Sequence, residues 1–115
     1  MELSLLGSVV QVVVDRPLGS YHPKHHDIYY PINYGYIPDT MAGDGEPVDA
    51  YILGVDEPVQ KYTGKVIAVI RRLNDVEGKL VVASPDKLFS KEEIAEAVRF
   101  QEQYFHTEII CDGLY

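Results

Sequence analysis

Three acidic residues lie within six positions in the segment "DGEPVD", at Asp44, Glu46 and Asp49. Two carboxylates about 4 Å apart repel each other by about 4 kcal/mol at an effective dielectric near 20, so such a group is either dispersed in water or gathered by a cation. Convergence needs a bend, because a straight strand would direct Asp49 to the opposite face, and Gly45 and Pro47 permit and fix one. Oxygen ligands without cysteine suit Mg²⁺ or Mn²⁺. A solvated acidic loop is the plain alternative.

A second acidic group occurs in the segment "NDVEGK", which places Asp75 and Glu77 in a tight turn and Lys79 at the start of the next strand. By itself the segment is typical of an ordinary hairpin turn. In a small curled sheet, however, adjacent strands would bring this turn near the first acidic loop. The five carboxylates would then form one polar pocket with nearby lysines and tyrosines.

The elements that must position these groups are short strands. β-Branched and apolar patterns predict strands at residues 8–15, 28–37, 48–53, 64–73 and 79–84. The second of these is irregular or lies at a sheet edge, because a proline and a glycine interrupt it. In the third, alternation directs residues 48, 50 and 52 to one face and residues 49, 51 and 53 to the other. The apolar N-terminal stretch lacks a basic leader and a small-residue cleavage site, which favours a strand over a signal peptide.

A helix is predicted after the last of these strands. Ser90 and Glu93 have the spacing of a capping box, and Phe89 and Ile94 stand in the positions of a hydrophobic staple. An apolar stripe then continues to about residue 106. About five strands and one late helix predict a small barrel or curled sheet with the helix packed against it.

The bulk composition restricts the class of protein. The 115 residues fit one domain, and Cys111 is the single cysteine, which excludes an internal disulfide and fits a reducing cytoplasm. The sequence contains no run of 18 apolar residues, so no membrane span is predicted. The net charge of −8 disfavours nucleic acid and anionic lipid as partners. A phosphate-bearing ligand would therefore need a basic pocket or bound cations.

The stretch "YYPINYGYIPDTMAGDGEPVDAYIL" resembles the signature region of the family I soluble inorganic pyrophosphatases, in which Y-P-x-N-Y-G-Y precedes D-G-D-P-x-D and a strand. The segments "VVVDRP", "NDVEGKLVVA" and "QEQYFH" resemble further segments of that family in the same order. The resemblance covers most of the chain from Val12 to Tyr104. It implies a mainly β fold, an OB-like five-stranded barrel with a C-terminal helix, and Mg²⁺-dependent hydrolysis of pyrophosphate to two phosphates.

The resemblance also implies residue roles. Position by position, the expected metal ligands are Asp44, Asp49, Asp75 and Glu77, with Asn74 as the alternative to Asp75. Asp49 would bridge two ions, Glu46 would help to deprotonate the attacking water, and Asp15 would be an acidic residue behind the ligands. The expected phosphate contacts are Tyr30, Tyr34, Lys79 and Tyr104.

Three departures from the family pattern bear on activity. Glu46 replaces an aspartate, and misplacing a reacting group by about 1 Å can reduce a rate about a hundredfold. Phe105 replaces a phosphate-binding lysine. The segment 16–29 is much shorter than the family's hairpin, which carries a Lys, a Glu and an Arg. Compensating charges or donors within it would be Arg16, Lys24, His22, His25 and His26.

The sequence is also compatible with two other functions. The same site could cleave another phosphoanhydride, in a nucleotide or a polyphosphate, or the chain could be a catalytically decayed module that binds metal or phosphate. An OB-like barrel can also bind single-stranded nucleic acid, but the acidic charge and the lack of a basic, aromatic groove argue against it. As in bacterial members of the family, we expect a symmetric homo-oligomer.

Overall fold

The computed structural model of the protein describes residues 2–73 and 78–111. The acidic turn predicted to contain Asp75 and Glu77 therefore falls outside the described residues. The elements in chain order are a 3₁₀ helix η1 (Glu2–Leu5), β1 (Val9–Arg16), β2 (Asn33–Ile37), β3 (Val48–Ile52), β4 (Lys61–Arg72), β5 (Gly78–Ala83), α1 (Lys91–Glu102) and β6 (Thr107–Cys111). Within the described ranges, neither helix is long and apolar enough to cross a lipid bilayer.

Five of the strands close into a barrel, as the sequence predicts. The sheet order is β1-β2-β3-β5-β4-β6, and the pairing of β1 with the first part of β4 closes the ring. Only the β3–β5 pair is parallel among the described pairings. That parallel register sets Asp49 opposite Lys79. Closure leaves no open sheet edge between β1 and β4.

Alternation along the strands divides the apolar residues between two cores. In β3, Val48, Ala50 and Ile52 point into the barrel, whereas Tyr51 packs on the outside beneath α1. All six residues of β5 are buried, because the inside of the barrel covers one face and α1 covers the other. This two-sided burial explains why the sequence of β5 is almost continuously apolar.

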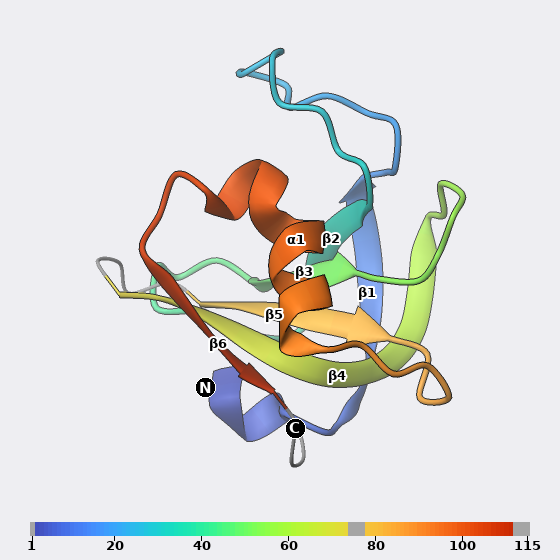
Figure 1. Ribbon diagram of the computed structural model, residues 1–115, viewed down its shortest axis with the longest axis vertical. Helices are drawn as coiled ribbons and strands as arrows, with labels where there is room; N and C mark the ends of the chain where they lie inside the picture. Colours follow the sequence, from blue (N-terminus) through green and yellow to red (C-terminus); the bar gives the residue numbers. More distant parts are fainter. Residues whose placement is uncertain (1, 74–77, 112–115) are drawn as a thin grey trace.

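Helix α1 lies across the outer face of the sheet (Figure 1). It begins at the predicted capping box, in which the Ser90 hydroxyl accepts a hydrogen bond from the Glu93 amide and the Glu93 carboxylate accepts one from the Ser90 amide. Ile94 and Val98 are buried against the sheet. The C-terminal end of α1 points toward the long loop between β1 and β2 (Figure 1).

The structure corrects three details of the predicted elements. β2 begins at Asn33 and pairs with both β1 and β3, so it is not an edge strand, and residues 28–32 belong to the preceding loop. The helix ends at Glu102, because the chain turns there and places Tyr104 and Phe105 in a connecting segment. β6, which pairs with the second half of β4, was not predicted. Its five residues carry too short a pattern to distinguish a strand from the end of the apolar stripe.

Candidate functional site

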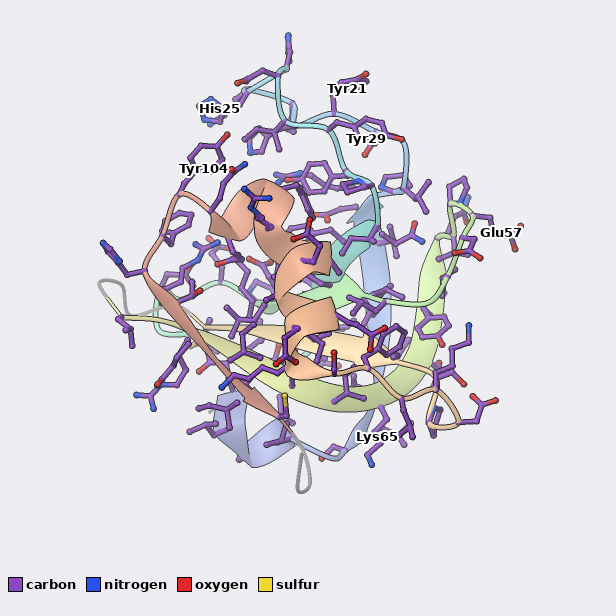
Figure 2. All side chains as sticks on the ribbon, viewed as in Figure 1. Tyr21, His25, Tyr29, Glu57, Lys65 and Tyr104 are labelled. Carbon is purple, nitrogen blue, oxygen red and sulfur yellow. The ribbon has the colours of Figure 1, made fainter. Side chains whose placement is uncertain are left out.

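A cavity of about 490 Å³ lies between the β1–β2 loop and the C-terminal end of α1. Figure 2 shows the side chains of His25 and Tyr104 close together on this side of the loop, whereas Tyr21 and Tyr29 lie on the other side. The residues that line the cavity are Arg16, His22, His25, Asp27, Ile28, Tyr34, Arg72, Lys79, Gln101, Tyr104 and Phe105. Basic groups and hydrogen-bond donors outnumber the single carboxylate in this lining, although the chain as a whole is strongly acidic.

Arg16, the last residue of β1, supplies positive charge on one side of the cavity. Its Nη1 donates a hydrogen bond of 3.0 Å to the Tyr30 hydroxyl, and its guanidinium lies within about 6 Å of the Tyr30 and Tyr34 rings. Within residues 2–73 and 78–111, no carboxylate approaches Arg16 within 4.0 Å. The Tyr30 hydroxyl therefore orients the guanidinium, and the charge of Asp15 acts on it from beyond ion-pair distance.

Lys79 and Asp49 meet where β5 pairs with β3. The Lys79 ammonium donates to the Asp49 carboxylate at 2.7 Å, and it lies 5.6 Å from the centre of the Tyr34 ring. The Lys79 side chain is only 4% exposed, against 30% for that of Asp49, so the carboxylate retains access to solvent. Burial raises the pKa of the Tyr34 phenol, although the charge of Lys79 opposes this, and the hydroxyl stays protonated as a donor.

Asp15 lies near enough to Asp49 for their charges to interact. Desolvation raises the pKa of the Asp15 carboxyl above its usual value; the charge of Arg16 opposes the shift, and that of Asp49 adds to it. Asp49 is thus paired with Lys79, and the Asp15 carboxyl interacts with the charges of both Arg16 and Asp49.

A chain of polar contacts runs under the cavity from Tyr30 to Arg72. Tyr30 donates to the Gln101 side chain at 2.8 Å, Gln101 donates to the Tyr51 hydroxyl at 2.8 Å, and Tyr51 donates to Glu102 at 2.5 Å. Glu102 also accepts two hydrogen bonds from Arg72, of 3.0 and 2.8 Å. Burial, followed by the adjacent Glu102, raises the pKa of the Tyr51 phenol well above its usual value, so Tyr51 remains a donor.

Arg72 is held from a second direction by an aromatic ring. Its guanidinium carbon lies 3.7 Å from the centre of the Phe105 ring, a cation–π geometry. Phe105, at the position of a lysine in the resembled family, therefore packs on a cation that comes from β4.

The β1–β2 loop is folded around the His22 ring. The backbone amides of Lys24 and His25 both donate to His22 Nδ1, at 3.0 and 3.1 Å. The His22 and His25 rings are 4.8 Å apart. Desolvation, together with the charges of Arg16, His25 and Lys24, lowers the pKa of His22, whereas Asp27 opposes the shift.

The predicted acidic loop lies between β2 and β3. Gly45 has φ +85° and forms the expected bend, and the Asp44 carboxylate accepts a hydrogen bond of 3.0 Å from the Glu46 amide. Asp44 and Glu46 are both exposed. Across the described part of the chain, no three acidic, histidine or cysteine side chains converge on one point. The predicted meeting of Asp44, Glu46 and Asp49 is thus not found, while the predicted set that includes residues 74–77 falls outside the described residues.

The structure brings together four of the six predicted substrate contacts. Arg16, Tyr34, Lys79 and Tyr104 line the cavity. Tyr30 is fully buried and supports Arg16 from behind, and Lys24 is exposed on the loop.

Sequence reasoning missed Arg72, Gln101 and Glu102, although a signal for each exists. Arg72 follows Ala68 and Ile70 at the strand period of two, which places it on the buried face. Gln101 and Glu102 continue the helical stripe of Ile94 and Val98.

A closed barrel with a basic cavity beside two carboxylates defines a small β-barrel protein suited to an anionic ligand. The sequence model described as inorganic pyrophosphatase matches residues 10–107. The chain therefore belongs to the inorganic pyrophosphatase family. It is 34% identical over 101 residues to the inorganic pyrophosphatase of Sulfolobus acidocaldarius, covering 69% of this chain and 57% of the relative. It is 37% identical over 57 residues to that of Rhodospirillum rubrum, covering 47% and 32%.

Solved structures confirm the fold. The inorganic pyrophosphatase of Ehrlichia chaffeensis superimposes with a TM-score of 0.70 at 20% identity, covering 92% of this chain and 87% of the other. That of Neisseria gonorrhoeae gives 0.61 at 21% identity, covering 85% and 74%. The sequence matches span about a third to somewhat more than half of the length of these first curated relatives.

Proposed function

We propose that this protein hydrolyses inorganic pyrophosphate to two phosphates at the cavity between the β1–β2 loop and α1, with Mg²⁺ as its cofactor. The observation that carries the proposal is the 2.7 Å pair of Asp49 and Lys79 beside Arg16 and Tyr34. This arrangement places the solvent-accessible Asp49 carboxylate next to hydrogen-bond donors of three side chains that suit phosphate oxygens. Membership of the inorganic pyrophosphatase family supports the choice of substrate.

The acidic side chains fit a hard divalent cation by their chemistry. Asp15 and Asp49 repel each other, which contributes to the raised pKa of Asp15, and a cation would relieve that repulsion. Asp49 and Asp44, with Asp75 and Glu77, are the residues that would hold it. When bound, Mg²⁺ would supply positive charge for phosphate oxygens and lower the pKa of a water molecule.

The chain's own donors account for substrate binding. Arg16, Lys79 and Tyr34 would donate to phosphate oxygens and stabilise the negative charge that grows on the leaving phosphate. A guanidinium can bind two such oxygens at once. Glu46 is proposed as the acceptor of the proton from the attacking water. We expect the enzyme to act in the cytoplasm, as a homo-oligomer.

The direct test is an assay of phosphate release from pyrophosphate with Mg²⁺, with and without EDTA. Asp49→Asn keeps the side-chain shape and removes the charge, and activity should fall at least about a hundredfold, since outer partners of metal ligands alone are worth ten- to a hundredfold. Asp56→Asn, at an exposed loop position, is the matched control and should retain activity. Turnover that survives both EDTA and Asp49→Asn would refute the proposal.

A second candidate is hydrolysis of a larger phosphoanhydride, in a nucleotide or a polyphosphate. It is favoured by the apolar side chains of Ile28, Tyr104 and Phe105 in the cavity, where an organic group would pack. The same assay with ATP and tripolyphosphate decides between the two. A kcat/KM higher for either of these than for pyrophosphate would replace the first proposal with the second.

A further inference from the structure

The His22 ring lines the cavity. Its hydrogen bonds show which of its two nitrogens carries the proton. Two backbone N–H groups, those of Lys24 and His25, donate to Nδ1. An atom that accepts from N–H donors must present a lone pair, so Nδ1 carries no proton. In the neutral ring the proton is then on Nε2, and protonating Nδ1 would break both contacts.

The charges around the ring favour the same neutral state. Arg16 from β1 and Lys24 and His25 from the loop face His22, and among the described residues Asp27 opposes them. The pKa of His22 is accordingly lowered. Tyr104, from the segment after α1, lines the same cavity. At neutral pH the ring thus offers a single N–H donor.

We propose that His22 is a substrate-binding residue that donates its Nε2–H to a phosphate oxygen of the anion in the cavity. The ring lines the cavity together with Arg16, and its other nitrogen is engaged by its own loop. The donor would take the place of one of the basic side chains that the short β1–β2 segment lacks. The inference rests on the proposed function, because it assumes that the cavity binds a phosphate-bearing anion.

Two substitutions separate this role from that of holding the loop. In His22→Asn, the amide oxygen can replace Nδ1 as acceptor for the two backbone amides, but nothing reaches the position of Nε2. In His22→Gln, the longer amide can place an N–H₂ near that position. If His22 only held the loop in place, the asparagine variant would bind the anion as tightly as the native protein does.

The experiment is calorimetric titration with imidodiphosphate, a slowly hydrolysed analogue of pyrophosphate, in the presence of Mg²⁺. We expect His22→Asn to weaken binding by roughly ten- to a hundredfold, the value of a hydrogen bond to a charged group. His22→Gln should recover part of that loss. His26→Asn is the matched control and should bind normally, because the His26 ring faces the Pro23 carbonyl, 3.0 Å from its Nε2.

Nitrogen NMR of the histidine rings gives a readout that does not depend on any variant. In the native protein, His22 should show a protonated Nε2 and an unprotonated Nδ1, and the Nε2 signal should move on addition of imidodiphosphate while that of His26 does not. Native affinity in His22→Asn, or a His22 signal that stays unchanged while Arg16→Ala loses affinity, would overturn the inference and leave the proposed function intact. No binding by the native protein would overturn both.

Discussion

Two arginines in the cavity are oriented by different kinds of partner. Arg16 contacts the Tyr30 hydroxyl and no carboxylate within 4.0 Å in the described ranges, whereas Arg72 forms two hydrogen bonds to Glu102. This difference indicates that the two arginines have different roles. In the proposed function Arg16 would bind the anionic substrate, while Arg72 fixes the end of α1 against β4 and thereby the Gln101 and Tyr104 side of the cavity.

The buried pair of Arg72 and Glu102 should be important for stability. Their side chains are 6% and 4% exposed, and removing one member of such a pair leaves a poorly solvated charge. Glu102→Gln should therefore lower the free energy of unfolding by roughly 3 kcal/mol. Chemical denaturation measures this change.

The matched control is Glu96→Gln. Glu96 lies 3.9 Å from Arg99, and both side chains are more than half exposed, so the loss should be below about 0.5 kcal/mol. Equal losses in the two variants would show that burial of the Arg72 pair adds nothing.

At the scale of elements, β1 and β2 approach too closely for a side chain at Gly35. A Cβ atom there would lie 1.9 Å from the Val13 carbonyl oxygen. Gly35→Ala should force the strands apart, displace the adjacent Tyr34, and destabilise the fold by roughly 3 kcal/mol. Thermal unfolding tests this prediction.

Gly19→Ala is the comparison for Gly35→Ala. Gly19 has φ +91° with open space around it, so only backbone strain of about 1 kcal/mol should result. A Gly35→Ala variant no less stable than Gly19→Ala would show that the two strands can separate freely.

Elements that are set by neighbouring residues could be predicted from the sequence, whereas those set by contacts between distant residues could not. The capping box at Ser90 and the alternation of β3 are local, and both were confirmed. The termination of α1 at Glu102 and the pairing of β6 with β4 depend on contacts distant in sequence, so no local pattern revealed them.

The candidate site shows the same division between local and distant contacts. The family resemblance indicates Lys79, but its partner Asp49 follows from the parallel register of β3 and β5, two strands that are not neighbours in the sequence. Arg72 was detectable from strand period, whereas its stacking on Phe105 was not. The hydrogen bonds to His22 Nδ1 depend on the fold of the loop, which "YHPKHH" does not specify by itself.

At the scale of the whole molecule, the charges are unevenly distributed. The chain carries a formal charge of −8, yet Arg16, Arg72 and Lys79 gather at one cavity. An acidic surface would oppose the approach of the proposed phosphate substrate, so the local cations and a bound metal ion would have to provide the attraction. The barrel makes this possible by bringing the ends of β1, β4 and β5 under one loop and one helix end.

The central claim is that this cavity binds pyrophosphate between the chain's donors and cations held by its carboxylates. A crystal structure of the protein with Mg²⁺ and imidodiphosphate tests it most directly. We predict phosphate oxygens in contact with Arg16, Tyr34 and Lys79, and a Mg²⁺ ion on Asp49. An analogue bound outside the cavity, or Mg²⁺ ions bound with no contact to Asp49, would contradict the account.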